Sequence, residues 1–177
     1  IKEMVPEMKI LIGDVQHLPF KDSVFDGIWS LGVIEHFKDG YILQIEELIW
    51  CLKDGGYVFL SFPYLSPLRR IKGWLSLYQN EDVIQKLDIP FYQYALPSHS
   101  VIGYLESLGL TLIEKQPYDG IKCVKDEVPI FKKTFQKIYD YNGPNKYMHF
   151  MKRYLDRLFV LFGSHMILLI FKKGENN

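Results

Sequence analysis

The chain has 177 residues, of which 48% are hydrophobic and 24% are charged, and this is the composition of an ordinary globular protein. Lysine plus arginine and aspartate plus glutamate each number 21, so the formal net charge is zero. Nucleic-acid-binding proteins usually carry a basic excess, so we expect no nucleic-acid partner. The length favours a single domain over residues 1–177.

No stretch reads as a signal peptide or as a membrane-spanning helix. Residues 1–14 lack a basic region followed by a long apolar core. The longest apolar stretch, 158–171, is interrupted near Gly163 and is shorter than the ~20 residues that span a bilayer. Cys51 and Cys123 lie far apart and form no metal-binding pattern. We therefore expect reduced thiols, no bound metal and a cytoplasmic protein.

Apolar runs alternate with a helical pattern along the first part of the chain. Residues 9–12, 25–31 and 57–62 predict strands, and residues 41–52 predict a helix that ends at the glycines of 54–56. Strand, helix and strand in that order, with continuously apolar strands, indicate right-handed βαβ units and a parallel sheet.

The remaining sequence predicts two more strands and three more helices. Helices are expected at 98–108, 129–141 and 145–162, and strands at 111–115 and 165–172. Residues 64–96 and 118–164 therefore read as two insertions, which we interpret as lid or substrate-binding segments.

Three stretches carry recognisable motifs: GDVQHLPFKDSVFD at 13–26, SLGVIEHF at 30–37 and LKDGGYV at 52–58. In order and spacing they resemble the motifs of the class I S-adenosylmethionine-dependent methyltransferases, most closely the type 11 subgroup. The resemblance implies a doubly wound, mostly parallel α/β sheet of the Rossmann-like type, with strand 165–172 inserted antiparallel beside 111–115. It also implies S-adenosylmethionine as cofactor and methyl transfer to the oxygen, nitrogen or carbon of a small-molecule acceptor.

Asp14 follows directly after a predicted strand, at the edge where open α/β sheets bind ligands. Its carboxylate can accept a hydrogen bond from the amine of adenine, while the N–H of Val15 or Gln16 meets a ring nitrogen. The alternative is that Asp14 caps a turn. We favour adenine binding, and expect the carboxylate to point into a cleft that Leu31 and Gly32 also line.

The resemblance places Ser30, Leu31 and Gly32 beside the methionine part of the cofactor. Gly32 permits close backbone approach, although a glycine at a strand end is also a simple turn. His36, on the same loop, is the candidate general base, because imidazole titrates near neutrality. Alternatively it shapes the cofactor pocket or caps the next helix, since positioning alone can supply much of the rate of methyl transfer. Asp26, which begins a strand, is interpreted as structural.

Two features of the family do not occur in the sequence as given. These are the G-x-G-x-G loop of the first strand and the acid that holds the ribose after the second. We therefore expect the chain to begin after that second strand and to bind the cofactor weakly by itself. We also expect strand 25–31 to have an open edge that pairs with a further part of the protein, a second copy or a partner.

Other functions remain open at this point. The chain is alternatively a methyltransferase-like binding module without catalysis, a fragment inactive without its N-terminal half, or part of a dehydrogenase. The E-H and D-G-G motifs argue against the dehydrogenase.

The insertions contain candidates for substrate recognition. Residues 67–78 are basic and aromatic at helical spacing, which is typical of a packed amphipathic helix, a lid over the site or a helix on a membrane surface. Tyr92, Tyr94 and His99 are candidates for the acceptor pocket. The apolar stripe of 148–162 is expected to be core.

Overall fold

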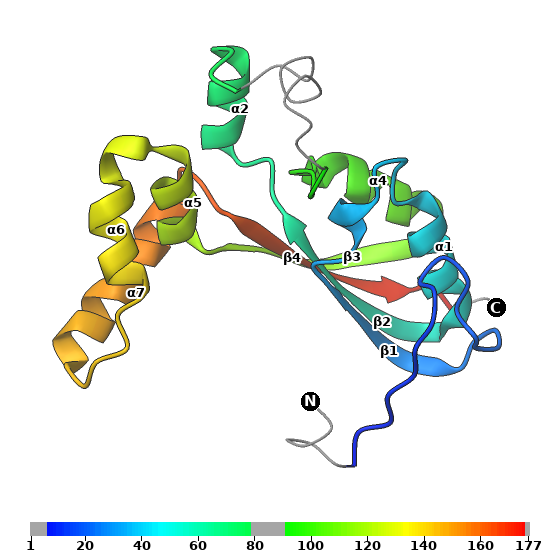
Figure 1. Cartoon of the computed structure of the whole chain (residues 1–177). Helices are drawn as coiled ribbons and strands as arrows, with labels where there is room; N and C mark the ends of the chain where they lie inside the picture. The colour runs from blue at the N-terminus through cyan, green and yellow to red at the C-terminus, as the bar shows by residue number, and fades with distance from the viewer. Residues whose placement is uncertain (1–6, 79–90, 176–177) are drawn as a thin grey trace.

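The computed structural model describes residues 7–78 and 91–175. Its centre is a four-stranded sheet with the spatial order β1-β2-β4-β3 (Figure 1). β1 and β2 are parallel, and β4 is antiparallel to both of its neighbours, so β4 alone is reversed in this sheet. The predicted place of the last strand is thereby confirmed. The strands are β1 (Phe25–Leu31), β2 (Leu52–Pro63), β3 (Leu110–Tyr118) and β4 (Met166–Lys173).

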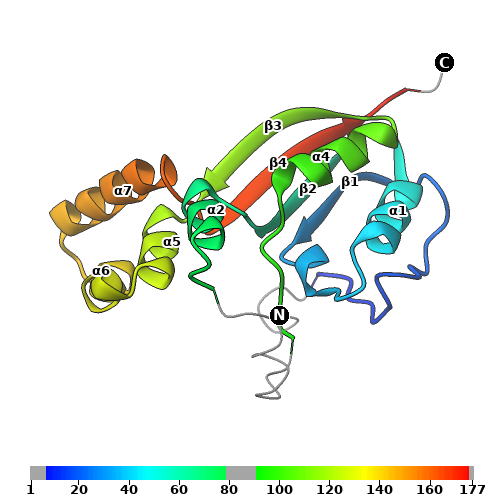
Figure 2. The same ribbon diagram turned by 90° about the horizontal axis from the view of Figure 1, so that it is seen from above.

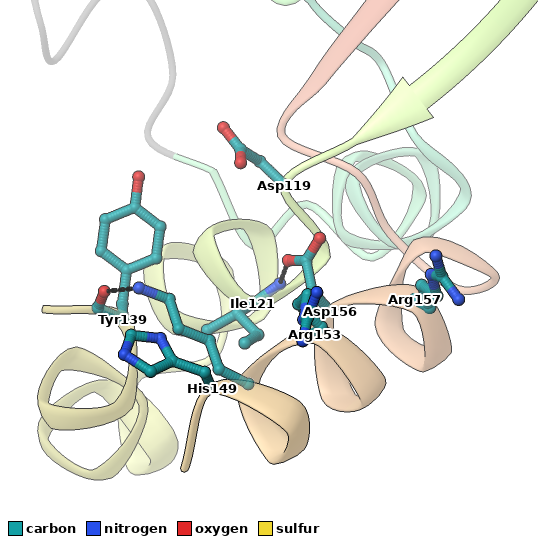
Figure 3. A pocket seen from close by; sticks show the side chains of 8 residues that line it. Asp119, Ile121, Tyr139, His149, Arg153, Asp156 and Arg157 are labelled. Atoms are coloured by element: carbon teal, nitrogen blue, oxygen red, sulfur yellow. Dashed lines mark hydrogen bonds between the residues drawn. The ribbon is translucent and has the colours of Figure 1, made fainter. Parts of the chain in front are cut away.

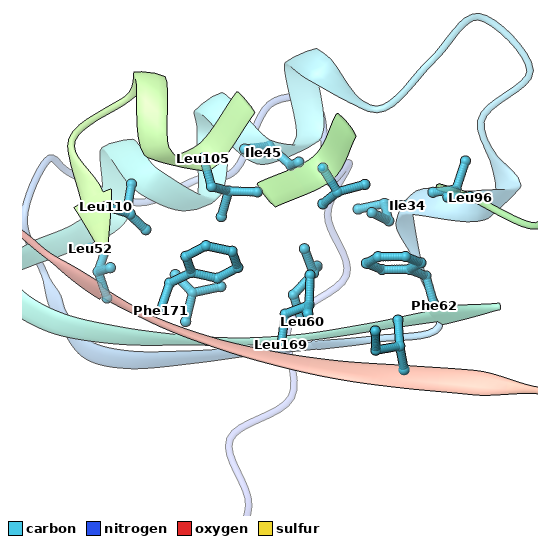
Figure 4. Packing of buried hydrophobic residues seen from close by; sticks show 13 residues of the cluster. Ile34, Ile45, Leu52, Leu60, Phe62, Leu96, Leu105, Leu110, Leu169 and Phe171 are labelled. Carbon is cyan, nitrogen blue, oxygen red and sulfur yellow. The ribbon is translucent and has the colours of Figure 1, made fainter. Parts of the chain in front are cut away.

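Two helices, α1 (Ile42–Cys51) and α4 (Ser98–Ser107), cover one face of the sheet (Figures 2 and 4). The core forms between them and the strands, because alternate strand residues point to this face. Its fully buried members include Ile45, Val101 and Leu105 from the helices and Leu60, Phe62, Leu169 and Phe171 from the strands.

The opposite face of the sheet is open. Trp29 stacks on Phe59 with ring centroids 4.3 Å apart, yet Trp29 is 65% exposed and Leu31 is 52% exposed. In the part of the chain that the structure describes, β1 pairs with β2 alone. The predicted open edge of strand 25–31 is therefore present in these residues.

One predicted strand is absent from the described residues, and another begins earlier than predicted. Residues 9–12 are an exposed coil, with Ile12 fully exposed, because no described strand pairs with them. α1 ends at Cys51 rather than at the glycines, and β2 begins at once. Residues 53–56 instead bulge out of β2, between the pairs Phe25↔Leu52 and Gly27↔Tyr57. Gly56 is needed there, since a Cβ would lie 2.8 Å from Lys53 O.

The first insertion contains α2 (Pro67–Trp74), which is shorter than the predicted 67–78. The second contains α5 (Gly120–Glu127), a 3-10 turn (Pro129–Phe131), α6 (Lys132–Tyr139) and α7 (Lys146–Val160), and Figure 1 shows this group beyond one end of the sheet. The sequence did not indicate α5 as a helix.

The expectation that 148–162 is core was wrong. None of the residues of α7 is buried, and Phe150, Tyr154 and Leu161 are 62%, 59% and 72% exposed. The physical reason is that α7 packs against α5, β3 and Phe135 of α6, while no further described element covers its remaining side. Within the described ranges, no helix has the length and apolar content needed to cross a bilayer.

Candidate functional site

The site begins where β1 ends. Gly32 has φ of +68°, a conformation that favours glycine, and its N–H donates to Ser61 O at 2.9 Å. A Cβ there would lie 3.4 Å from Glu35 Oε1. Ser30, 4% exposed, points to the helix-covered side, while Leu31 points to the open side. The three predicted residues are thus contiguous but do not share one face.

Glu35 is a site residue that sequence reasoning passed over. It lies in a 3-10 turn (Ile34–His36), its side chain is 3% exposed, and its Oε2 has no hydrogen-bond partner among the described residues. Ser30 Oγ is likewise buried and without a partner in this part of the chain. Burial raises the pKa of Glu35. Because buried polar groups rarely go unpaired, the two atoms mark a place where a ligand can supply the partner. The E-H pair in the motif was the available signal.

His36 is oriented by the first insertion. Its Nδ1 lies 2.7 Å from Tyr92 O, and the two rings meet edge to face with centroids 5.2 Å apart. A carbonyl can only accept, so the proton of the neutral ring is assigned to Nδ1. Nε2 is then free to accept a proton and lies 3.9 Å from Glu35 Oε1. This arrangement suits a general base.

The three residues proposed for the acceptor pocket do not come together. Tyr92 lies beside His36 and is 73% exposed. The N–H of Tyr94 donates to Glu35 O at 3.0 Å, which ties the same segment to the site. His99 is exposed on α4 and makes no hydrogen bond to the described residues. Their role in acceptor binding stays a prediction.

Asp14 adopts the turn that was the alternative to adenine binding. Its Oδ1 accepts a hydrogen bond from Gln16 N at 2.9 Å, and its carbonyl accepts one from His17 N at 3.1 Å. The Gln16 N–H is therefore occupied, which leaves that of Val15 for a ring nitrogen. Oδ2 lies 3.7 Å from His17 Nδ1, and the Asp14 side chain is 60% exposed, so it can still accept from a ligand.

This turn is tied to the first two turns of α1. Gln44 is completely buried. With its amide oriented so that both its oxygen and its nitrogen have hydrogen-bond partners, the oxygen accepts from Gln16 Nε2 at 2.6 Å. Leu18 N donates to Glu47 Oε2 at 3.1 Å. α1 starts at the sheet edge where β1 ends, so these contacts support the expected position of Asp14 at the carboxyl edge. That Asp14 shares one cleft with Leu31 and Gly32 stays a prediction.

The residues present fit part of S-adenosylmethionine. Asp14 offers an exposed carboxylate and Val15 an N–H for adenine, and Gly32 allows the backbone to approach closely. The unpartnered Glu35 carboxylate is an acceptor for a positively charged or N–H-bearing group. Asp26 pairs with Lys53 at 2.8 Å, which lowers the pKa of Asp26 and agrees with its structural interpretation.

A buried ionic cluster joins the two insertions. Glu127 of α5 accepts hydrogen bonds from Arg69 Nε at 2.7 Å, Lys72 Nζ at 2.7 Å and Tyr78 OH at 2.8 Å. Burial acts to raise the pKa of Glu127, but these three hydrogen bonds outweigh it and lower the pKa. The contact favours the packed-helix interpretation of 67–78 over a lid or a membrane helix.

His165 lies on the same cluster, with Nδ1 2.9 Å from an Arg69 nitrogen and Nε2 against Lys122 Nζ. Burial, together with the charges of Lys122 and Arg69, lowers the pKa of His165 to about 4. The imidazole is therefore neutral at physiological pH.

No group of three or more His, Cys, Asp or Glu residues is placed to hold a metal within 7–78 and 91–175. Cys51 and Cys123 are both buried free thiols, and burial raises the pKa of each. A hollow of about 600 Å³ lies away from the β1 site, between α5 and α7 (Figure 3). No sequence motif had indicated it.

Comparison with known proteins identifies others that share motifs or the fold with this chain. A family model described as a methyltransferase domain matches residues 2–60. The tRNA U34 carboxymethyltransferase of Campylobacter curvus (strain 525.92) is 49% identical over 51 residues, which are 29% of this chain and 17% of that protein. A SAM-dependent methyltransferase from Archaeoglobus fulgidus superposes with a TM-score of 0.56 at 15% identity, covering 97% of this chain and 71% of that one. The [4+2]-cyclase SpnF gives 0.53 at 13% identity, covering 99% and 59%.

The sheet order and the loop after β1 define a Rossmann-like α/β protein. Residues 2–60 match the methyltransferase-domain family, as the three motifs predicted, and the chain shares the fold of a SAM-dependent methyltransferase. It spans 17% of the curated relative that it matches. The shared fold of a cyclase shows that fold alone does not determine the reaction.

Proposed function

We propose that the protein transfers a methyl group from S-adenosylmethionine to the oxygen, nitrogen or carbon of a small-molecule acceptor. The observation that carries the proposal is the loop after β1, inside the segment that matches the family: Gly32 in a positive-φ conformation, a buried Glu35, and His36 with one nitrogen free. When bound, the cofactor supplies a methyl group on a positively charged sulfur.

In this proposal the chain's residues have separate tasks. Asp14 and the Val15 N–H hold adenine, and Gln16 fixes the turn that presents them. Ser30, Leu31 and Gly32 flank the methionine part, and Ser30 Oγ is available for a hydrogen bond. His36 takes a proton from the acceptor at Nε2, while the Tyr92 carbonyl holds the ring in place.

Cofactor binding by the full-length protein tests the assignment. Calorimetry with S-adenosylhomocysteine should show binding by the wild type and about tenfold weaker binding by Asp14→Asn, because a charge-assisted hydrogen bond is weakened. Asp39→Asn, which makes the same change at another exposed loop position, should bind like the wild type. Equal binding by Asp14→Asn overturns the adenine assignment. No binding by the full-length wild type overturns the enzyme proposal.

A tRNA acceptor is the second candidate, and the identity to a tRNA U34 carboxymethyltransferase favours it. The zero net charge of the chain favours a small molecule. Incubation of the protein with labelled S-adenosylmethionine and a cell extract separates the two. Label in the low-mass fraction supports the small-molecule proposal, and label in RNA supports the alternative. Cofactor binding without any transfer of label favours a non-catalytic binding module.

A further inference from the structure

The hollow between α5 and α7 is built by close backbone packing (Figure 3). A Cβ on Gly120 would lie 2.5 Å from Asp156 O, so only glycine lets α5 approach α7 this closely. Ile121 N then donates to Asp156 Oδ1 at 3.0 Å, which fixes the two helices against each other. The volume of about 600 Å³ lies within the range of small-molecule sites, roughly 300–1,000 Å³.

The charges around this hollow are unbalanced. Its lining has three basic residues, Lys152, Arg153 and Arg157, against two acidic ones, Asp119 and Asp156, although the whole chain is neutral. Lys152 Nζ is bound by Tyr139 O, and His149 Nε2 lies 2.8 Å from Gly143 O. The Asp156 carboxylate is engaged by the Ile121 N–H, and the Asp119 pKa is raised by burial and by the charge of Asp156.

Arg153 and Arg157 are left with their charges available. They lie one turn apart on α7, both are exposed, and neither makes a hydrogen bond or ion pair with the described residues. Both arginines also line a second hollow of about 280 Å³, whose other walls are Phe150 and Tyr154. The two guanidinium groups therefore lie between the larger hollow and the smaller one, which the two aromatic side chains line.

We infer that this place binds the phosphate group of a soluble small molecule. Guanidinium groups present planar pairs of N–H donors that match phosphate oxygens. Phe150 and Tyr154 provide an apolar wall for the rest of the molecule. β3 is parallel to β2 and ends at Tyr118, so α5 starts at the same sheet edge as the β1 site. The inference does not depend on methyl transfer, because binding is measured without cofactor.

Titration of the full chain with inorganic phosphate and with glycerol 3-phosphate tests this. We expect amide NMR shifts concentrated at 149–157 in the wild type, with glycerol 3-phosphate binding tighter than phosphate. Arg153→Gln with Arg157→Gln should weaken binding at least tenfold. The control is Lys133→Gln with Lys137→Gln, which removes the same charge at the same spacing from exposed positions of α6. It should bind within about twofold of the wild type, since screened surface charges act weakly.

Four results overturn the inference. One is wild-type shifts spread evenly over the surface, and another is equal weakening by the two double variants. A third is sedimentation with phosphatidylserine vesicles that requires both arginines while glycerol 3-phosphate does not bind, since the phosphate is then that of a lipid surface. The fourth is arginine-dependent binding of an RNA oligonucleotide without binding of glycerol 3-phosphate. The NMR measurement on the wild type stands even if the arginine variants fail to fold.

Discussion

At the scale of residues, the imidazole ring of His36 is oriented by a residue outside its own loop. The carbonyl that orients it comes from Tyr92, which is far away in the sequence. A base that is oriented in this way can be tested separately from cofactor binding, since Asp14 and Val15 are on another loop.

His36→Gln should lower kcat by roughly 10²-fold or more if Nε2 accepts the acceptor's proton. Its dissociation constant for S-adenosylhomocysteine should stay near that of the wild type. Lys38→Gln, at an exposed position two residues further along the chain, is the control and should change neither quantity. Both are measured by steady-state kinetics and calorimetry on the full-length protein. Unchanged kcat in His36→Gln shows that transfer proceeds by positioning alone.

His165 should make stability depend on pH. In the unfolded chain its pKa is near the ordinary value of 6.5, whereas burial, Lys122 and Arg69 lower the folded pKa to about 4. Above pH 6.5 both states are neutral. As the pH falls from 6.5 towards 4, His165 gains a proton in the unfolded chain but not in the folded one. The free energy of unfolding therefore decreases, by at most ~3 kcal/mol. Urea unfolding at pH 8 and pH 4.5 should show a smaller loss in His165→Gln than in the wild type. Equal losses would contradict the lowered pKa.

Some candidate site residues are indicated by a short sequence motif, whereas others are recognised only in the folded structure. Asp14, Gly32 and His36 lie in motifs whose spacing is readable along the chain, so they could be proposed as site residues from the sequence. Glu35 stood in the same motif, but its importance comes from burial and from an unpartnered oxygen, which only the packed structure reveals. The Asp14 turn was stated as an alternative, because an aspartate after a glycine suits both a turn and a ligand contact.

At the scale of elements, hydrophobic periodicity predicted the helices and strands whose own residues have a clear apolar pattern. The strand 25–31, the helix 98–108 and the antiparallel last strand are all present. The failures have tertiary causes. Residues 9–12 lack a described neighbour to pair with, and the 53–56 bulge follows from the register of β2 against β1. The stripe on α7 has the pattern of core but no second layer on its exposed side.

The cluster between α2 and α5 should contribute strongly to stability. Glu127→Gln leaves Arg69, which is 7% exposed, without its carboxylate, and this should lower the free energy of unfolding by about 3 kcal/mol. Glu106→Gln makes the same change at an exposed position of α4 and should have little effect. Urea denaturation at neutral pH measures both. A Glu127→Gln protein as stable as the control would mean that the cluster merely accompanies the packing.

At the scale of the whole molecule, apolar surface is left open in one region of the sheet. Trp29 and Leu31 lie on a face that α1 and α4 do not cover, and β1 has an unpaired edge among the described strands. Exposed flat edges of this kind recruit other chains.

We therefore expect the 177-residue chain, expressed as given, to associate with itself. Light scattering should report masses above 20.9 kDa at micromolar concentrations. Trp29→Lys places a charge on the open face and should reduce the association. Trp74→Lys, at a tryptophan that is 84% exposed on α2, should not. A stable monomer of 20.9 kDa in the unsubstituted chain would contradict the expectation.

The attachment of the α5–α7 segment has an evolutionary consequence. Tyr118, the last residue of β3, pairs with Met166, the first residue of β4, so the segment leaves and rejoins the sheet at adjacent positions. Insertions with neighbouring ends can be lengthened, shortened or exchanged without changing the strands that carry them. Glu127 binds this segment to the first insertion through its hydrogen bonds with Arg69, Lys72 and Tyr78. Evolution can therefore exchange the α5–α7 segment for a different one, provided that these charged contacts are preserved or replaced with it.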